Sequence, residues 1–528
     1  MAHTANITEK DNNDTIDQPI TNKKTSVNLG ADATLLTASK VITSLIALIM
    51  TMMLARIRSK AEMATFNQIF QVVEMLASVV MLGLPKSLNY FLSRIDTVEE
   101  RRKFLSFYYT LNTILSLVVG GMLVASSYLI STYLFHNEMI MAFLYFLALF
   151  PWTKIIMSSV ENLLIVSRKN KELIFFRIAN SVSLLAVVCI VSYAHLNFAV
   201  YMVMYLCVEA AYTLLVYSFA NKIGEGIRPY VSAKMLKTVL AFSIPLGLAS
   251  VVGTFNTYID KLIIGNLMST EKYAEYAVAA KELPLTIISS TFSAVMIPQM
   301  ARMIKKGKNN EAVNLWGQAT TLSMIIITFV GVACMYFSRD VLMVMYGKQY
   351  INFDCCLVFA VYSVYLILRC TYYGMALNSM GKSKYIFWCS IWALVSNAIL
   401  NVVLFFLFKL FGGEFVSPAV ATIITSVIMD YLQLHRTSKE MNIKFRDVFP
   451  WKNALTIIGI NAVLGGAFFG LKQVLPLENL LSFKIKNHTV DGSAFETIIL
   501  CIVWALIYFA IMFKKIKKTW KNLKVKEG

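Results

Sequence analysis

The sequence predicts an all-α polytopic membrane protein, and three observations support this fold class. Of the 528 residues, 57% are hydrophobic and only 15% are charged, which is more apolar surface than a soluble fold can hide. Apolar runs of about 20 residues, the length needed to cross a bilayer as a helix, recur along the whole chain. These runs do not alternate in the roughly ten-residue segments typical of membrane barrels.

Taken in chain order, the apolar runs predict about fourteen transmembrane helices. Each run approaches the required length of about 20 residues, and short polar gaps separate one run from the next. The predicted spans are 34–55, 65–91, 104–133, 138–161, 172–194, 197–220, 237–264, 273–299, 313–337, 352–376, 385–409, 415–434, 453–474 and 494–513.

The basic residues are placed mainly in the gaps between these spans. The net charge is +19, but the bases gather in the gaps between apolar runs, which argues against nucleic acid as a partner and favours a minor attraction to anionic membrane lipids. Of the 49 Lys and Arg residues, 33 are assigned to the side of the membrane that holds the N-terminus, ten to the opposite side, and six lie within the spans. This bias predicts that both termini lie in the cytoplasm.

Two halves of the chain are related in sequence. The separations between Pro85 and Pro298 and between Lys169 and Lys382 are both 213 residues. This spacing predicts two parallel six-helix repeats followed by two further helices. The expected segments are a disordered tail (1–33), a first bundle (34–220), a linker (221–236), a second bundle (237–434), a linker (435–452), two added helices (453–513) and a basic tail (514–528).

Polar residues line one face of the first two predicted helices of each half, at alternating steps of three and four residues. A single Ser or Thr on such a face commonly mediates helix packing, whereas an intramembrane charge more often faces a cavity or a partner. The candidate cavity and coupling residues are Asn67, Gln71, Glu74, Glu209, Asn256, Asp260, Lys261 and Glu282. Within the cavity, Glu74 and Glu209 would act as counter-charges to basic residues or as proton carriers.

Four bases lie about five to nine residues inside the predicted cytoplasmic ends of their spans. They are Lys40, Lys86, Lys154 and Arg369. They either snorkel to the interface or form a cationic pocket for an anionic group such as pyrophosphate. Near the outer ends, Asp260 is expected to pair with Lys281 on the neighbouring helix; direct contact with a substrate or ion and snorkelling are the alternatives.

The sequence shows no sign of an enzyme, a metal site or a cofactor. It contains neither H-E-x-x-H nor metal-ligand spacing of Cys and His, and it has no nucleophile elbow. The segment "ALNSMGKS" (376–383) fits a loose phosphate-loop pattern, but it falls in a short turn between two spans and lacks the preceding strand that nucleotide binding requires. Neither catalysis nor nucleotide binding is therefore expected.

Several stretches resemble the multidrug/oligosaccharidyl-lipid/polysaccharide flippase superfamily, and in particular its O-antigen and capsule repeat-unit flippases. They are "LKTVLAFSIPLGLASVVGTFNTYIDKLIIG" (236–265), "YAVAAKELPLTIISSTFSAVMIPQMARM" (276–303) and "ALNSMGKSKYIFWCSIWALVSNAILNVVLFF" (376–406). The resemblance covers residues 34 to about 515. It implies two six-helix bundles in a V around a central cavity, with two helices appended.

The resemblance also implies a function. Members of this branch flip undecaprenyl-diphosphate-linked oligosaccharide from the cytoplasmic to the outer leaflet of the bacterial inner membrane by alternating access, for surface polysaccharides such as capsule and lipopolysaccharide. Basic cavity residues hold the diphosphate, and Lys40 and Lys281 lie on the matching helices, although this chain offers mainly Lys where relatives favour Arg. H⁺ or Na⁺ is the implied coupling ion, and polysaccharide polymerase machinery is an implied partner.

Two other functions fit the same predicted fold. One is a lipid II flippase for peptidoglycan, and the other is a cation-coupled exporter of drugs or metabolites. The two additional spans count against the exporter, because such exporters have twelve. In each case a hydrophilic route is needed, since a polar headgroup entering hydrocarbon loses its hydrogen bonds to water.

Overall fold

The computed structural model describes residues 29–281, 283–474, 483–485, 488–490 and 492–524. Within these residues the protein is helical apart from one two-stranded hairpin, and thirteen helices are long and apolar enough to cross a membrane. A shorter apolar helix, α15 (Phe353–Leu368), lies within the tenth predicted span, 352–376. The predicted all-α membrane fold is therefore confirmed.

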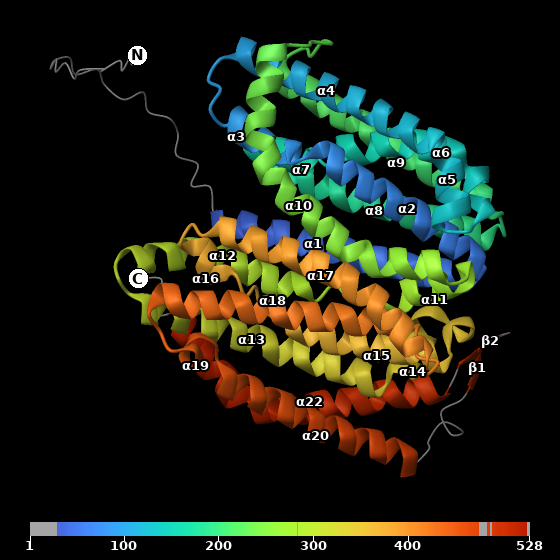
Figure 1. Ribbon diagram of the computed structural model, residues 1–528, viewed down its shortest axis with the longest axis vertical. Coiled ribbons are helices and arrows are strands. Elements are labelled where there is room, and N and C mark those ends of the chain that lie inside the picture. Colours follow the sequence, from blue (N-terminus) through green and yellow to red (C-terminus); the bar gives the residue numbers. More distant parts are fainter. Residues whose placement is uncertain (1–28, 282, 475–482, 486–487, 491, 525–528) are drawn as a thin grey trace.

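The N-lobe, residues 29–224, forms the upper body in Figure 1. Helix α2 begins at a capping box, in which the Ser59 hydroxyl and the Glu62 carboxylate each accept from the other residue's backbone amide. The elements of the N-lobe are α1 (Leu29–Ile57), α2 (Lys60–Met81), α3 (Leu84–Leu92), α4 (Val98–Ala125), α5 (Ser127–Leu129), the π-helix η1 (Ile130–Leu134), the 3₁₀-helix η2 (Glu138–Phe143), α6 (Leu144–Met157), α7 (Val160–Val166), α8 (Asn170–Tyr193) and α9 (Phe198–Gly224).

The C-lobe, residues 233–524, forms the lower body, and α10 runs from one body to the other (Figure 1). Its last two long helices, α20 and α22, both pack against α13. The elements of the C-lobe are α10 (Ala233–Leu267), α11 (Thr270–Ala279), α12 (Thr286–Lys305), α13 (Asn309–Tyr336), α14 (Ser338–Tyr346), the 3₁₀-helix η3 (Lys348–Tyr350), α15, α16 (Met375–Ser379), α17 (Ser383–Lys409), α18 (Ser417–Met441), α19 (Phe445–Val448), α20 (Trp451–Val474), the antiparallel strands β1 (Phe483–Ile485) and β2 (His488–Val490), and α22 (Gly492–Lys524).

Two helices, α2 of the N-lobe and α11 of the C-lobe, end at breaks after different lengths. In the N-lobe α2 runs for 22 residues before Leu82 and Gly83 adopt positive φ angles of 35° and 78°. In the C-lobe α11 ends after only ten residues, at Ala279, and α12 begins at Thr286. The predicted spans 65–91 and 273–299 are therefore each divided between two helices. Pro284 lies within the break between α11 and α12, where its missing amide hydrogen and its constraint on the preceding residue disfavour a helix.

The two lobes meet near the ends of α1, α10 and α14. At this end Lys60 of α2 forms an ion pair of 2.6 Å with Glu275 of α11, and Gln349 donates to the Arg58 carbonyl at 3.2 Å. Closer to the middle of α10, Gly247 contacts the backbone of the α2–α3 break, where an added Cβ would lie 2.0 Å from the Leu82 carbonyl carbon. Backbone contact at this crossing requires glycine.

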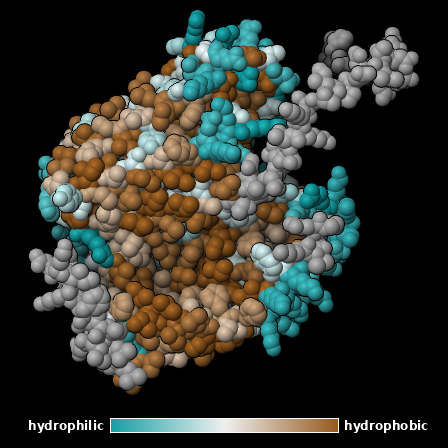
Figure 2. Space-filling model, turned by 180° about the vertical axis from the view of Figure 1, so that it is seen from behind, coloured by the Kyte–Doolittle hydropathy of each residue, from teal (hydrophilic) through white to brown (hydrophobic). Residues whose placement is uncertain are grey.

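The surface matches a protein embedded in a bilayer. Figure 2 shows a broad hydrophobic face, with hydrophilic residues gathered mainly along its right and upper edges. Large apolar side chains such as Leu214, Val463 and Leu506 are 60–73% exposed. Such extensive exposed apolar area in a folded chain is typical of contact with lipid.

Candidate functional site

A cavity of about 840 Å³ lies inside the C-lobe. Its walls come from α10, the break before α12, α12 itself, α15, α17 and α18. The volume is within the range of sites that enclose small ligands. Because every wall belongs to the C-lobe, we call it the C-lobe cavity.

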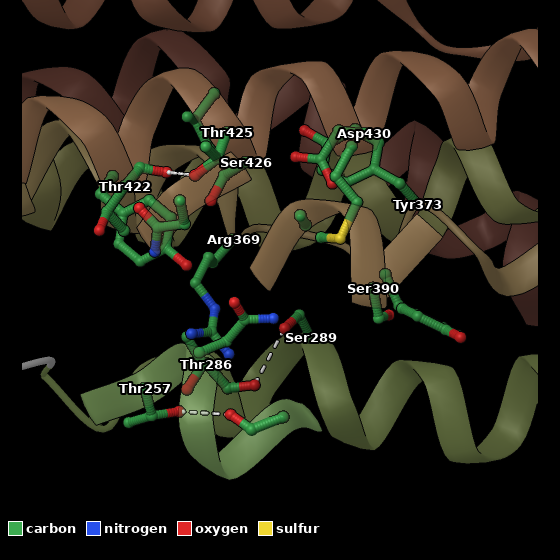
Figure 3. Close-up of a pocket in the computed structure, with 18 of the residues that line it drawn as sticks. Thr257, Thr286, Ser289, Arg369, Tyr373, Ser390, Thr422, Thr425, Ser426 and Asp430 are labelled. Carbon is green, nitrogen blue, oxygen red and sulfur yellow. Dashed lines mark hydrogen bonds between the residues drawn. The ribbon is translucent and has the colours of Figure 1, made fainter. Parts of the chain in front are cut away.

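Three bases line the C-lobe cavity, namely Lys261, Lys281 and Arg369. Figure 3 shows Arg369 reaching into the space between Thr422 and Thr286. Its guanidinium lies 5.7 Å from the centre of the Tyr365 ring. At this distance the cation is attracted to the face of the aromatic ring.

Lys281 reaches the cavity because the helix is interrupted around it. It lies two residues after the end of α11 at Ala279, and its ammonium donates to the Thr51 hydroxyl of α1 at 2.5 Å. Lys281 therefore connects the cavity wall to the N-lobe. Lys261 lies nearby on α10, with its ammonium 5.5 Å from the centre of the Tyr258 ring.

Asp260 is buried and is held by neutral hydrogen-bond donors. It is 3% exposed, and its carboxylate accepts hydrogen bonds from the Tyr276 hydroxyl at 3.2 Å, from the Tyr362 hydroxyl and from the Lys261 amide at 2.8 Å. The predicted pairing of Asp260 with Lys281 is therefore wrong, because Lys281 donates instead to Thr51. The two tyrosines come from α11 and α15, elements whose approach the sequence pattern did not indicate.

The rest of the cavity wall is rich in hydroxyl and amide groups. Many of the hydroxyls donate to carbonyls of their own helix, as Ser289 does to Thr286 and Thr257 to Gly253 (Figure 3). Their oxygen lone pairs can still accept a hydrogen bond from a ligand hydroxyl. The polar neutral lining residues include Asn256, Thr257, Thr286, Ser289, Ser290, Ser293, Ser390, Asn397, Thr422, Thr425, Ser426 and Gln433.

The candidate charges of the N-lobe are arranged differently. Lys154 on α6 forms a close ion pair with Glu74 on α2. Lys40 on α1 lies 2.9 Å from the carboxylate of Glu161, which also pairs with an arginine on α8. Glu209 on α9 is 8% exposed and accepts from the Asn180 amide at 3.4 Å.

The remaining candidates lie at helix contacts or outside the described residues. Gln71 is buried between the lobes, where its carbonyl accepts from the Tyr273 hydroxyl at 2.7 Å. Lys86 donates to Ser250 on α10 at 3.2 Å, and Asn67 donates to the carbonyl one turn before it. Glu282 lies outside the described residues. Lys40, Lys86 and Lys154 do not join Arg369 in one pocket, because none of the three lines the C-lobe cavity.

One charged residue of the cavity, Asp430, was not predicted from the sequence. Asp430 on α18 lines the C-lobe cavity (Figure 3), and its only sequence signal is that it is a lone acid in the apolar run 415–434. Among the described residues, no group of three or more His, Cys, Asp or Glu side chains could hold a metal ion.

Comparison with known sequences relates this chain to proteins of polysaccharide biosynthesis. A sequence profile of the family described as polysaccharide biosynthesis protein matches residues 53–354, more than half of the chain. The capsular polysaccharide biosynthesis protein CapF of Staphylococcus aureus is 22% identical over 231 residues, which are 41% of this chain. That match spans little more than half of CapF, 56% of its length.

Solved structures show the same fold at low sequence identity. The lipid II flippase MurJ in an inward closed conformation superposes with a TM-score of 0.69, covering 92% of this chain and 99% of MurJ, at 15% identity. An inward-facing multidrug resistance transporter of the MATE family within the MOP superfamily gives a TM-score of 0.61, covering 78% of this chain and 99% of that transporter, at 12% identity.

Proposed function

Because the chain belongs to the polysaccharide biosynthesis protein family of multi-pass MOP-superfamily transporters, we propose that it flips a lipid-linked oligosaccharide across the membrane. The proposed cargo is undecaprenyl-diphosphate-linked oligosaccharide, carried from the cytoplasmic to the outer leaflet by alternating access. The single observation that carries this proposal is the C-lobe cavity, which combines three bases with a hydroxyl-rich wall.

The cavity chemistry supports an anionic glycan as the cargo. A diphosphate accepts charge-assisted hydrogen bonds, for which Arg369 and Lys281 are suitable donors. Sugar hydroxyls both donate and accept, as do the side chains of α12 and α18 that face the cavity. Polar groups of this kind replace the hydrogen bonds that the headgroup loses on leaving water.

The lobe arrangement supports alternating access. The lobes are joined by Lys60–Glu275 at one end, and we assign this end to the outer side because the opposite end carries most of the bases. Both termini would then be cytoplasmic. Breaking the outer contacts while closing the lysine-rich end would expose the cavity to the other leaflet, and the lipid tail would remain in hydrocarbon throughout.

Reconstitution tests the proposal directly. Purified protein in liposomes should move a fluorescent undecaprenyl-diphosphate-linked oligosaccharide to the opposite leaflet, measured as its accessibility to a membrane-impermeant quencher. The same glycan on a monophosphate carrier should move more slowly, because one phosphate offers fewer acceptors to Arg369 and Lys281. Efflux of a cationic dye with no movement of either lipid would overturn the proposal and favour an exporter.

Lipid II is the second candidate cargo, because the superposition on the lipid II flippase MurJ covers 92% of this chain. Lipid II shares the undecaprenyl diphosphate and differs in the glycan. Preferential movement of lipid II over capsule-type oligosaccharide in the same liposomes would assign the protein to peptidoglycan. The reverse preference would assign it to surface polysaccharide.

A further inference from the structure

A second cavity, of about 300 Å³, lies at the lysine-rich end of the N-lobe and shares no lining residue with the C-lobe cavity. It is formed where the end of α3 meets the first turns of α4 and α10, at the upper left of Figure 1. Its lining residues are Phe91, Ile95, Glu100, Lys103, Phe104, Lys234, Met235, Thr238 and Val239.

The interior of this cavity is apolar. The rings of Phe91 and Phe104 lie 5.6 Å apart, and Phe104 and Val239 are 3% and 2% exposed. Met235 contributes a flexible side chain that can adapt to a ligand of irregular shape. The walls therefore suit a hydrocarbon chain and offer few hydrogen bonds to a polar one.

The mouth of the cavity is positively charged, in contrast to its apolar interior. Lys103 on α4 and Lys234 on α10 are both exposed, and Lys237 follows one turn after Lys234. Lys103 lies 2.6 Å from Glu99; for Lys234, no ion pair is formed within the described part of the chain. Glu100 is the one acid of the lining, so the cations outnumber it at the mouth.

From the apolar pocket and its cationic mouth, we propose that this cavity binds an anionic phospholipid. One acyl chain occupies the space between Phe91, Phe104 and Met235, and the phosphate lies against Lys103 and Lys234. The positions of Lys103 and Lys234 in the sequence agree with contact to a lipid headgroup. Both lysines lie just before an apolar run, because the run of α4 begins at Phe104 and that of α10 begins beyond Lys237. Lysines at this depth lie in the headgroup region.

The bound lipid would act on the helix that connects the lobes. Val239 near the start of α10 belongs to the same apolar cluster as Leu84 and Leu88 of α3, while the other half of α10 carries Asn256, Asp260 and Lys261 into the C-lobe cavity. A lipid between α3, α4 and α10 therefore holds the first turns of α10 against the N-lobe. Anionic lipid is thus a ligand of this inter-lobe joint, whatever cargo the protein carries.

Native mass spectrometry of the full-length protein in detergent tests the site without a transport assay. The wild type should retain phosphatidylglycerol in preference to phosphatidylcholine. Lys234→Ala should weaken phosphatidylglycerol binding about fivefold, and Met235→Trp should abolish the preference by filling the pocket. Glycerol phosphate without acyl chains should not compete, because it leaves the apolar pocket empty. Lys518→Ala, an exposed lysine on the distant end of α22, should bind as the wild type does.

Four results would overturn the proposal. Three are equal retention of the two lipids by the wild type, unchanged phosphatidylglycerol binding in Met235→Trp, and a loss in Lys518→Ala as large as that in Lys234→Ala. If Met235→Trp does not fold, Ile95→Trp fills the same pocket from the other side and takes its place. Competition by glycerol phosphate would also contradict it, by showing an anion site that needs no acyl chain.

Discussion

The interiors of the two lobes hold similar charged groups in opposite arrangements. In the N-lobe, Lys154 is paired with Glu74, and Lys40 with Glu161. In the C-lobe, the bases line a cavity of about 840 Å³, and Asp260 is held by tyrosine hydroxyls and a backbone amide. The N-lobe thus pairs these interior bases with acids, whereas in the C-lobe three bases and Asp430 line a cavity.

The position of the helix break explains part of this difference. The N-lobe helix continues for 22 residues and breaks beside α10, at Gly83. The C-lobe helix breaks after ten residues, which removes Lys281 from a regular helix and places it on the cavity wall. The earlier break therefore places a lysine on a cavity wall, whereas the later break allows close backbone contact with α10.

The largest effect is expected from removing two cavity bases together. Lys281→Ala combined with Arg369→Ala should reduce binding of a diphosphate lipid by about 100-fold or more, because each charge-assisted hydrogen bond contributes roughly 1.5–3 kcal/mol. Equilibrium binding to the purified protein measures this. The exposed Lys384→Ala is the matched control, and an equal loss in that variant would show that overall charge, not the cavity, governs binding.

A smaller effect, on stability and not on binding, is expected in the N-lobe. Lys154→Met leaves Glu74 without its cation; breaking a fully buried pair costs about 3–5 kcal/mol, and we expect about 1–2 kcal/mol here because both side chains are about one-third exposed. Thermal unfolding should show this loss. Lys154→Met with Glu74→Gln should recover most of it, and an equal or greater loss in the double variant would contradict the pairing.

A milder change tests how the C-lobe holds its acid. Tyr362→Phe removes one hydroxyl donor to Asp260 while the Tyr276 hydroxyl remains. We expect a stability loss of about 1 kcal/mol and a change in diphosphate-lipid binding of only a fewfold. Tyr365 also lines the cavity, so the stability and binding of Tyr365→Phe provide the comparison for those of Tyr362→Phe. A 100-fold binding loss in Tyr362→Phe would mean that the hydroxyl contacts the ligand itself.

The smallest effect is expected at Lys40. Its side chain is 51% exposed, and Glu161 would keep its second partner, Arg177. Lys40→Ala should therefore change stability by less than about 1 kcal/mol and diphosphate-lipid binding by less than about twofold. A loss approaching that of the double cavity variant would place Lys40 in the binding site and remove the contrast between the lobes.

The sequence predicted the helical membrane fold because apolar runs report directly on burial in a bilayer. It also identified Lys261, Lys281 and Arg369, since intramembrane charges stand out against such runs. It did not predict that Asp260 would bind Tyr276 and Tyr362, because tyrosines in apolar spans carry no signal of their partners. Nor did the sequence separate Lys154 from the cavity bases. Helix periodicity shows which face of a helix carries a residue, but it does not show which other helix packs against that face.

The most direct test of the contrast between the lobes is to map where the anionic head of the cargo binds. An undecaprenyl diphosphate probe with a photoactivatable group beside the phosphates would be cross-linked to the purified protein, and the modified peptides identified by mass spectrometry. We expect cross-links to the segments around Lys281, Ser290 and Arg369, and these should be reduced by excess unlabelled lipid. Competed cross-links confined to the segments around Lys40, Glu74 and Lys154 would contradict it.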